Sequence, residues 1–345
     1  MRQSILTLIL SLMISSTMAQ TAQVPGSKYV CPPCNSDCDE IVHDSPGVCE
    51  HCNMALVEQD MTKTIAFYLQ DGVEVLDFAG PLEVFVYSGY RVFTVSEKQE
   101  PIVSQGVLDV VPDYSIDNAP EADILAFFGG NANAPAQNKK VIDWIKAQED
   151  IEYHFSVCTG AFVLAEAGIL DGKTATTFHS ALNNFEKNYP KIDVRKDVRY
   201  VDNGEVITTA GISAGIDGAL HLVAKLQGLN AAKRTAYYME YDNWQIGNGL
   251  ILSDDNPYLA QTANNFLEEF EGQYEYENNT QLAIRLNKNR GYLEAVINEI
   301  AYPVYHESGD LFSDVGNDAI QFERNSNGKV TGYYLADNKT KYLKL

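Results

Sequence analysis

A single cysteine, Cys158, stands apart from the other five cysteines of the 345-residue chain. It lies in YHFSVCTGAFVLAEAGIL, between a run typical of a β-strand and a run typical of a helix. Ser156, Gly160 and Ala161 surround it, and a nucleophile on a sharp strand-to-helix turn needs such small neighbours. The N-terminus of the following helix is expected to point at the sulfur and to lower its pKa. The pattern favours a reactive thiol over a buried structural cysteine.

Two carboxylates could serve as the acid partner of this thiol. Glu74 and Asp77 both lie in QDGVEVLDFAGPLEVF. Either could carry a proton between the nucleophile and a substrate. Asp77 has an alternative role as the N-cap of a helix expected to begin near Gly80 and Pro81.

Negative charge that develops on a substrate would need hydrogen-bond donors. The backbone N–H groups of Gly130, in FFGGN, and of Thr159 are the candidates for this role. A plain turn at the end of a strand is the alternative interpretation of FFGGN. His179, in TATTFHS, is a candidate base, whereas His221 lies inside the apolar pattern GALHLVAKL and is interpreted as a packing residue.

The other five cysteines crowd together near the start of the chain. Cys31 with Cys34, and Cys49 with Cys52, form two C-x-x-C pairs, each on a tight turn that can aim two sulfurs at one point. Four thiolates suit a structural zinc ion. A segment as short as residues 28–59 cannot bury a core, so a metal would supply its folding energy.

Further donors lie between and after these pairs. They are Cys38, His43, His51 and Met54. Cys38 is expected to stay outside the zinc site, because the two symmetric pairs already complete a four-thiolate set. Two disulfides, or a relay for a soft metal that uses the spare donors, are the alternatives.

From residue 63 to about 244, strand-like and helix-like runs alternate. The strand-like runs are TIAFYL, YRVFTVS, ADILAFFGG, EYHFSV and EVITTAG, and the helix-like runs are GPLEVFVYSG, NKKVIDWIKAQ, GAFVLAEAGIL and GIDGALHLVAKLQG. This alternation predicts an α/β fold with a mostly parallel sheet sandwiched by helices. Sites in such folds lie at the carboxyl ends of the strands, which is where Cys158 lies.

The two ends of the chain have other patterns. Residues 1–19 combine a basic Arg2, the short apolar run 5–14 and the small residues Thr17 and Ala19, which predicts a signal peptide. We therefore expect an exported protein, periplasmic or secreted, without a membrane span. The helix-like NPYLAQTANNFLEEFEGQ is followed, from Tyr274 onward, by short strand-like runs, and Asn327–Gly328 is a hairpin signal. A small antiparallel β domain is therefore expected over residues 261–345.

The formal net charge of −22 argues against nucleic acid as a partner, because phosphate binding needs clustered Lys and Arg. A hydrophobic content of 45% suits a globular chain that buries a full core.

Residues 63–244 resemble the ThiJ/PfpI superfamily, which has the class I glutamine amidotransferase-like fold. CTGAFVLAEAGILDGKTATT and TTAGISAGIDGALHLV most resemble the isonitrile hydratase branch and the amidotransferase-like domains of AraC-type regulators. The resemblance implies that Asp77, in Asp-x-x-Gly-Pro, is the catalytic acid, as in the hydratase branch. Glu74 matches the acid of the deglycase and protease branches, and we favour Asp77. The protease branch places a His after the nucleophile, where this chain has Thr159.

Residues 28–59 resemble the small heavy-metal-binding domain of copper and silver resistance proteins and of some metal-pumping ATPases. The matching motifs are Tyr29-x-Cys31-Pro32 and Pro46-Gly47-x-Cys49-x-x-Cys52-x-Met54-x-Leu56. That family usually has Met-His-Pro where this chain has Pro33-Cys34-Asn35, and the change favours four-thiolate zinc. Less specifically, EGQYEY and FERNSNGKVTGYYL resemble β modules that follow exported serine hydrolase domains of the β-lactamase type.

These patterns together predict hydration or hydrolysis of a small electrophilic substrate, with isonitrile hydratase as the nearest model. Cys158 attacks, Asp77 or Glu74 moves the proton, and Gly130 and Thr159 hold developing charge. Zinc is expected in a structural role, with no cofactor for catalysis, and the resemblance implies a homodimer. The alternative is a non-enzymatic metal- or redox-responsive binding protein.

Overall fold

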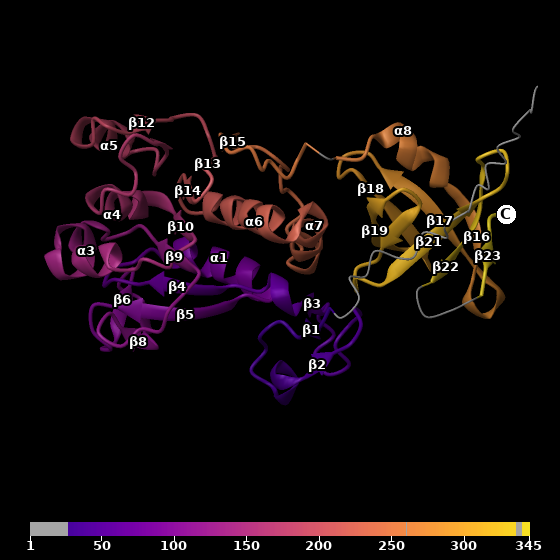
Figure 1. Ribbon diagram of the computed structural model, residues 1–345, viewed down its shortest axis with the longest axis horizontal. Helices are drawn as coiled ribbons and strands as arrows, with labels where there is room; N and C mark the ends of the chain where they lie inside the picture. Colours follow the sequence, from indigo (N-terminus) through magenta and orange to yellow (C-terminus); the bar gives the residue numbers. More distant parts are fainter. Residues whose placement is uncertain (1–26, 260, 336–339) are drawn as a thin grey trace, which may run out of the picture.

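The computed structural model describes residues 27–259, 261–335 and 340–345, so the predicted signal peptide lies outside the described residues. Three parts follow one another along the chain: a small cysteine-bearing sheet, an α/β domain and an antiparallel β domain (Figure 1). Within these residues, no helix combines the length and apolar character that a membrane crossing requires.

An eight-stranded sheet forms the centre of the α/β domain, in the order β15-β13-β14-β10-β9-β4-β5-β8. Only the pair β13–β14 is antiparallel, and the other described neighbours are parallel. The prediction of a mostly parallel sheet is confirmed. The strands are β4 (Thr64–Tyr68), β5 (Arg91–Ser96), β8 (Tyr114–Ser115), β9 (Ile124–Phe127), β10 (Tyr153–Ser156), β13 (Tyr200–Asp202), β14 (Val206–Thr209) and β15 (Leu250–Ile251).

Side chains along each buried strand point alternately to the two faces of the sheet, so both faces are apolar. Helices cover both of them. In β4, Ile65 and Phe67 face one core, whereas Ala66 and Tyr68 face the other. The first core is closed by α1 (Val75–Tyr87), α6 (Ala214–Gln227) and α7 (Leu229–Tyr238). The second is closed by α2 (Asn133–Gln137), α3 (Lys139–Lys146), α4 (Ala161–Glu166) and α5 (Leu182–Asn188).

Smaller strand pairs complete the first two parts. A hairpin, β6 (Ile102–Ser104) with β7 (Leu108–Val110), and the pair β11 (Thr174–Ala175) with β12 (Asp193–Val194) lie beside the central sheet. The cysteine-bearing module is a three-stranded antiparallel sheet in the order β2-β1-β3, made of β1 (Tyr29–Val30), β2 (Val42–His43) and β3 (Val57–Glu58).

The start of α1 differs from the sequence prediction. The helix begins at Val75, so Glu74 is its N-cap residue and Asp77 lies inside its first turn. Gly80 and Pro81 are interior positions, and a Cβ on Gly80 would lie 2.8 Å from the Ile216 side chain of α6. Helix α1 therefore continues through Pro81 and packs closely on α6, and the interpretation of Asp77 as an N-cap is wrong.

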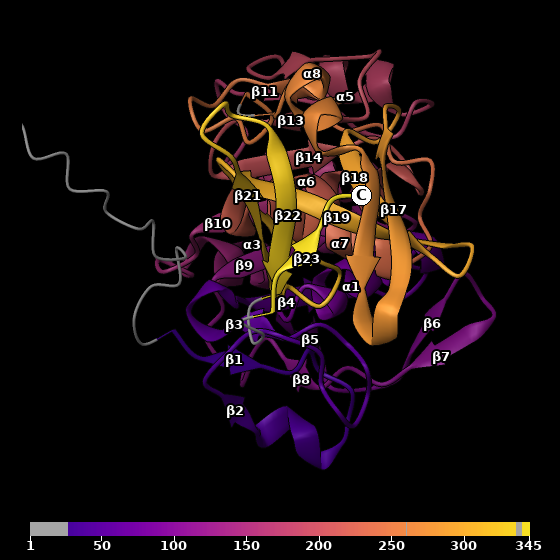
Figure 2. The ribbon, with the colours of Figure 1, turned by 90° about the vertical axis from the view of Figure 1, so that its right-hand side faces the viewer.

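The last part is an antiparallel sheet of eight strands that follow one another from β16 to β23. Its two edges meet: Tyr274 of β16 bridges Lys344, and the Leu345 N–H donates to the Gln273 carbonyl over 2.8 Å. The result is a nearly closed barrel, seen in front of the α/β domain in Figure 2. The strands are β16 (Gly272–Tyr276), β17 (Thr280–Asn287), β18 (Tyr292–Ile297), β19 (Ile300–Ser308), β20 (Leu311–Ser313), β21 (Ala319–Arg324), β22 (Val330–Leu335) and β23 (Tyr342–Leu343).

Aromatic side chains fill the interior of this barrel. The Phe270 ring lies 4.8 Å from Phe312 and 4.9 Å from Phe322, and all three side chains are buried. The helix expected in NPYLAQTANNFLEEFEGQ is shorter in the structure. It consists of α8 (Asn264–Leu267) and a 3-10 turn, Glu268–Phe270. Insertion of Phe270 into the barrel outweighs the helical preference of the segment.

Helix α7, which the sequence did not predict, holds the β domain against the α/β domain. The Asn230 side chain donates to the His306 carbonyl over 2.7 Å, and the Tyr238 hydroxyl donates to the Val315 carbonyl over 3.2 Å. Arg234 donates to the Ser313 hydroxyl over 3.1 Å, and its guanidinium lies 5.3 Å from the centre of the Tyr305 ring.

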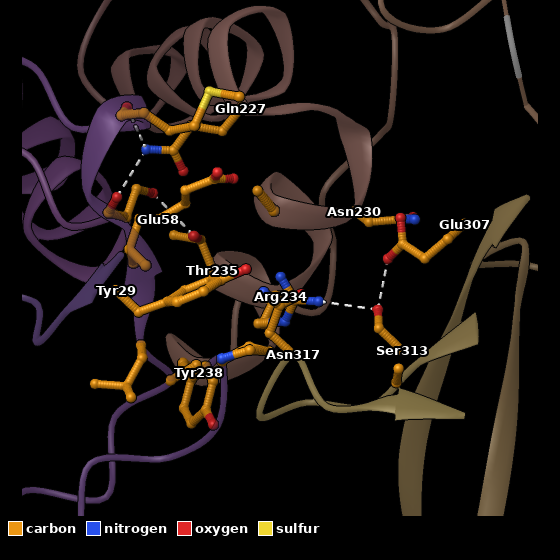
Figure 3. A pocket seen from close by; sticks show the side chains of 18 of the residues that line it. Tyr29, Glu58, Gln227, Asn230, Arg234, Thr235, Tyr238, Glu307, Ser313 and Asn317 are labelled. Atoms are coloured by element: carbon orange, nitrogen blue, oxygen red, sulfur yellow. Dashed lines mark hydrogen bonds between the residues drawn. The ribbon is translucent and has the colours of Figure 1, made fainter. Parts of the chain in front are cut away.

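All three parts of the chain line a cavity of about 470 Å³ beside α7. Figure 3 shows Tyr29 and Glu58 of the cysteine module on one side, Gln227 and Arg234 of the α/β domain in the middle, and Ser313 of the β domain opposite. The cavity marks the junction at which the three parts meet.

We predict that Arg234→Ala loosens the β domain. Because the variant loses a charged hydrogen bond and a cation–π contact, the free energy of unfolding of that domain in urea should fall by about 1–3 kcal/mol. The exposed Arg285 of β17 offers a matched control, and Arg285→Ala should change stability by less than about 0.5 kcal/mol. Equal stability of the two variants would contradict this role of Arg234.

Candidate active site and metal centre

Cys158 occupies the predicted strand-to-helix turn. Strand β10 ends at Ser156, and a 3-10 turn, Cys158–Gly160, leads into α4. The φ of Cys158 is +58°, which is uncommon for a residue with a side chain and marks a strained position. A Cβ at Gly160 would lie 2.3 Å from the Phe127 carbonyl oxygen, so the small neighbour in the sequence is a steric requirement.

Neighbouring strand ends hold this turn in place. The Cys158 N–H donates to the Ala210 carbonyl over 2.9 Å, and the Thr177 hydroxyl donates to the Cys158 carbonyl over 2.6 Å. The backbone of the nucleophile is therefore anchored on both sides, and its buried side chain has little freedom.

The acid partner in this structure is Asp77. Its fully buried carboxylate accepts the N–H of Gly129 over 2.8 Å and the N–H of Ile212 over 3.1 Å, and it forms a side-chain hydrogen bond with Cys158. Burial raises the pKa of Asp77 to about 6, although the two N–H donors and the thiol favour its charged form. A carboxyl group with such a pKa can both accept and release a proton near neutral pH.

The thiol carries the proton of this pair. Burial, followed by the negative charge of Asp77, raises the pKa of Cys158 to about 12, and the N–H and hydroxyl of Thr159 only partly oppose this. The sequence predicted that the N-terminus of the helix would lower the pKa of Cys158. The pKa is raised instead, because burial beside a carboxylate outweighs the effect of the helix.

Glu74, the alternative acid, points elsewhere. It is the partly exposed N-cap residue of α1 but makes no side-chain capping hydrogen bond, and its carboxylate accepts a hydrogen bond from the Gln105 side chain. Its negative charge contributes to the raised pKa of Asp77. The geometry therefore brings Asp77, and not Glu74, to the thiol.

Among the candidate donors, Thr159 is close to the thiol. Its buried hydroxyl lies beside the Cys158 sulfur and favours the charged form of the thiol, so it is placed to donate to a substrate atom bound there. Gly130 lies in a turn with φ +82°, and a Cβ there would come 2.2 Å from the Gly72 carbonyl oxygen. Its role as an oxyanion donor stays a prediction.

Sequence reasoning missed two residues that shape the site. A Cβ at Gly129 would lie 2.6 Å from the Asp77 carboxylate and 2.7 Å from the Cys158 sulfur, so only glycine fits between them. Ile212 has φ +54°, a strained value for a β-branched residue, and presents its N–H to Asp77. The available signals were FFGGN for Gly129 and the Gly-rich run AGISAG for Ile212, each after a strand.

The two histidines considered in the sequence have partners other than the Cys158 thiol. His179 is exposed, and its ring lies 4.2 Å from that of Phe178. His221 is buried in α6, where it hydrogen-bonds Asp202 over 2.8 Å and Tyr258 over 3.0 Å. It stabilises the core of the α/β domain.

In the N-terminal module, the cysteine sulfurs gather at one place. Two overlapping sets each keep their ligand atoms within 4.8 Å of one another. We name them the four-thiol group, Cys31, Cys38, Cys49 and Cys52, and the mixed group, Cys31, Cys34, Cys38 and Asp39. The sulfurs of Cys31 and Cys52 are 3.2 Å apart and those of Cys31 and Cys38 are 3.8 Å apart, so these contacts are not disulfides, and all the cysteines are free.

The four-thiol group differs from the predicted ligand set, because Cys38 takes the place of Cys34. The 3-10 turn Asp37–Glu40 buries Cys38 against the other sulfurs, whereas Cys34 lies at the edge and is half-buried. Regular C-x-x-C spacing did not reveal this turn. Which four thiols bind a metal stays a prediction.

The donor set of the module fits a thiophilic metal ion. Burial raises the pKa of Cys31 and of Cys52. In Cys49, where burial also opposes ionisation, the backbone N–H groups of Cys52 and His51 lower the pKa of the thiol to about 7. Thiolates held this close together repel one another without a cation, and a zinc-like ion prefers such ligands.

Comparison with known proteins places the chain in a family. The model of the DJ-1/PfpI family matches residues 63–225. An isonitrile hydratase from Pseudomonas putida is 34% identical over 184 residues, which cover 52% of this chain and 79% of that protein. The chain belongs to the DJ-1/PfpI family. The heavy metal binding domain model matches residues 28–59, ahead of the DJ-1/PfpI domain.

Other relatives resemble the DJ-1/PfpI domain. The HTH-type transcriptional regulator CdhR of Pseudomonas aeruginosa is 30% identical over 175 residues, or 49% of this chain, and the chain spans about half the length of that regulator, 52%. A THiJ/PfpI family protein from Pseudomonas syringae has a TM-score of 0.49 and 27% identity, covering 54% of this chain and 78% of that one.

We predict that Asp77→Asn makes Cys158 more reactive. The substitution removes a negative charge and a proton acceptor beside the thiol, so the pKa of Cys158 should fall from about 12. Each unit of lowered pKa raises the thiolate fraction at a given pH about tenfold. Alkylation of Cys158 by iodoacetamide, followed site by site by mass spectrometry, should therefore be faster in Asp77→Asn. Glu74→Gln is the matched control and should change the rate little; slower alkylation of Asp77→Asn would refute the assigned pairing.

Proposed function

We propose that the DJ-1/PfpI domain is a cysteine-dependent hydratase or hydrolase of small electrophilic substrates, with isonitrile hydration as the nearest model. The observation that carries the proposal is the buried hydrogen bond between the Cys158 thiol and the Asp77 carboxylate. The isonitrile hydratase of Pseudomonas putida is the relative that supports this choice of substrate class.

The paired groups suit addition to the terminal carbon of an isonitrile. The Cys158 sulfur forms a bond to that carbon, while the thiol proton passes through Asp77 to the same carbon and gives a thioimidate. Water then adds to the thioimidate carbon, and the carbon–sulfur bond breaks as sulfur regains a proton. One isonitrile and one water give one N-substituted formamide, with no oxidant or reductant.

The surrounding donors would stabilise charge during these steps. The Thr159 hydroxyl is available to a substrate atom next to the sulfur. Backbone N–H groups of Thr159 and Gly130 are the proposed donors to nitrogen or oxygen as negative charge develops. The strained, anchored turn keeps the sulfur aligned with them.

The heavy metal binding domain would bind its ion, proposed to be zinc, in a structural role. Its strand β3 packs on the α/β domain: a Cβ at Gly89, just after α1, would lie 2.9 Å from the Val57 side chain. Gln227 of α6 also donates to the Met61 carbonyl over 3.1 Å. An ordered module therefore braces the end of α1, the helix that carries Asp77.

We also propose that the mature protein is exported to the periplasm or secreted and that it forms a homodimer. Export rests on the signal-like pattern of residues 1–19, and the dimer rests on the resemblance to the superfamily.

A metal- or redox-responsive binding protein is the second candidate. The cluster of free thiols favours it, because such a cluster can bind metal or oxidise without any turnover at Cys158. The two candidates differ in whether Cys158 supports catalysis.

We predict that the purified wild type converts small isonitriles to formamides and that Cys158→Ala does not. Asp77→Asn should lower kcat/KM by about 10²–10⁴-fold, because it removes the proton carrier. Glu74→Gln should keep activity within about threefold of wild type, because the Glu74 carboxylate accepts a hydrogen bond from Gln105 and not from the Cys158 thiol. Formamide would be measured by chromatography, with nitriles and α-oxoaldehydes as further substrates.

Turnover that survives in Cys158→Ala would exclude the cysteine mechanism. Equal losses in Glu74→Gln and Asp77→Asn would exclude the assignment of the acid. If wild type converts none of these substrates, the binding-protein candidate replaces the enzyme.

We predict that chelation unfolds the cysteine module alone. Removal of the ion should raise backbone hydrogen exchange across residues 28–59, because this short segment lacks a sufficient core of its own. The sheet of the α/β domain should stay protected, since both its faces are buried independently of the module. Unchanged exchange in residues 28–59 after complete metal removal would show that the ion has no structural role.

A further inference from the structure

The two ligand groups of the cysteine module share an edge. The four-thiol group and the mixed group both contain the sulfurs of Cys31 and Cys38. Beyond this pair, the four-thiol group adds two thiols and the mixed group adds Cys34 and an oxygen of Asp39. One tetrahedral ion uses four ligands, so a single ion leaves two donors of this cluster unused.

We propose that the module binds two divalent thiophilic ions side by side, bridged by the thiolates of Cys31 and Cys38. One ion takes the four-thiol group and the other takes the mixed group. The inference rests on the proposed metal-binding role of the module and extends it from one ion to a two-ion cluster.

Distances within the cluster support shared ligands. Two sulfurs on one tetrahedral ion, with bonds of about 2.3 Å, lie about 3.8 Å apart. The bridging sulfurs of Cys31 and Cys38 have this separation, 3.8 Å. On one side Cys31 contacts the Cys52 sulfur over 3.2 Å, and on the other Cys38 contacts the Cys34 sulfur over 3.3 Å. Both bridging sulfurs also lie within 4.8 Å of every other ligand atom in each of the two groups.

The oxygen ligand of the mixed group is held in position. The Asp39 carboxylate accepts the N–H groups of Cys34, over 3.1 Å, and Asn35, over 2.9 Å. The Cys34 sulfur lies 3.1 Å from the same carboxylate, which belongs to the turn that buries Cys38. A thiol and a carboxylate beside the shared edge are thus arranged before any ion binds.

Charge balance permits the second ion. Four thiolates around one divalent ion carry a net charge of about −2. A second divalent ion adds two positive charges and brings in Cys34 and Asp39 as two negative ligands, so the net charge stays the same. The mixed sulfur and oxygen ligands favour Zn²⁺ or Cd²⁺ over Cu⁺, which prefers sulfur alone.

The test counts ions bound to the full mature chain. The Cys158→Ser background removes the one thiol outside the module. Cd²⁺ or Zn²⁺ would be added in excess, loosely bound ions removed by gel filtration, and the remainder counted by native mass spectrometry. We expect two ions per chain, and two separate ¹¹³Cd resonances in the cadmium form.

Loss of a ligand from one group should leave the other group occupied. Cys34→Ser, Asp39→Asn and Cys49→Ser should each bind one ion instead of two. Asp37→Asn is the matched control, because Asp37 is an exposed acid of the same turn that belongs to neither group, and it should keep two. The Asp39→Asn and Asp37→Asn pair keeps every thiol, so a difference between them cannot come from a lost sulfur.

Saturation at one ion in the parent chain, unchanged in Cys34→Ser and Asp39→Asn, would overturn the two-ion cluster and leave the proposed single structural ion intact. Two ions retained in both variants would also overturn it, since the second ion would then lie elsewhere. Binding of no ion would overturn both this inference and the metal part of the proposed function.

Discussion

The Asp77 carboxylate and the Cys158 thiol share one proton in a buried site, and the geometry of the DJ-1/PfpI domain is arranged around that contact. Burial disfavours charge on both groups, so both pKa values rise, to about 6 and about 12. Two backbone N–H groups stabilise the carboxylate and a hydroxyl lies beside the sulfur. The pair is therefore stable as thiol and carboxylate, while transfer of the proton to a substrate is what makes the sulfur nucleophilic.

This contact explains several costly features of the fold. The backbone is left-handed at Cys158 and at Ile212, which lowers the stability of the fold. Position 129 has no room for a side chain and must be glycine. These features persist because α1, the β10–α4 turn and the end of β14 must bring an acid, a sulfur and N–H donors to one point. Helix α7 and the module at the end of α1 hold this frame from outside.

The sequence predicted the sheet and the turn that carries Cys158 better than it predicted the side-chain contacts of the site. Alternating strand and helix runs and the small neighbours of Cys158 have direct steric causes, so the sheet and the turn could be read from residue types. The choice between Glu74 and Asp77 could not, because it depends on where α1 begins, and the helix begins at Val75, before Asp77. The raised pKa of the thiol depends on burial, which spacing does not reveal. In the cysteine module, a 3-10 turn brings in Cys38 where regular spacing favoured Cys34.

Infrared difference spectroscopy of the Cys158 S–H stretch tests the shared proton most directly. Wild type minus Cys158→Ala, at neutral pH, isolates this thiol from the others. The account predicts an S–H band in wild type, at the low frequency of a thiol that donates a hydrogen bond, and a shift of that band when Asp77 becomes Asn. It also predicts the bands of an ionised Asp77 carboxylate above its pKa of about 6. An absent S–H band together with a protonated Asp77 carboxyl band at neutral pH would place the proton on the acid and contradict the account.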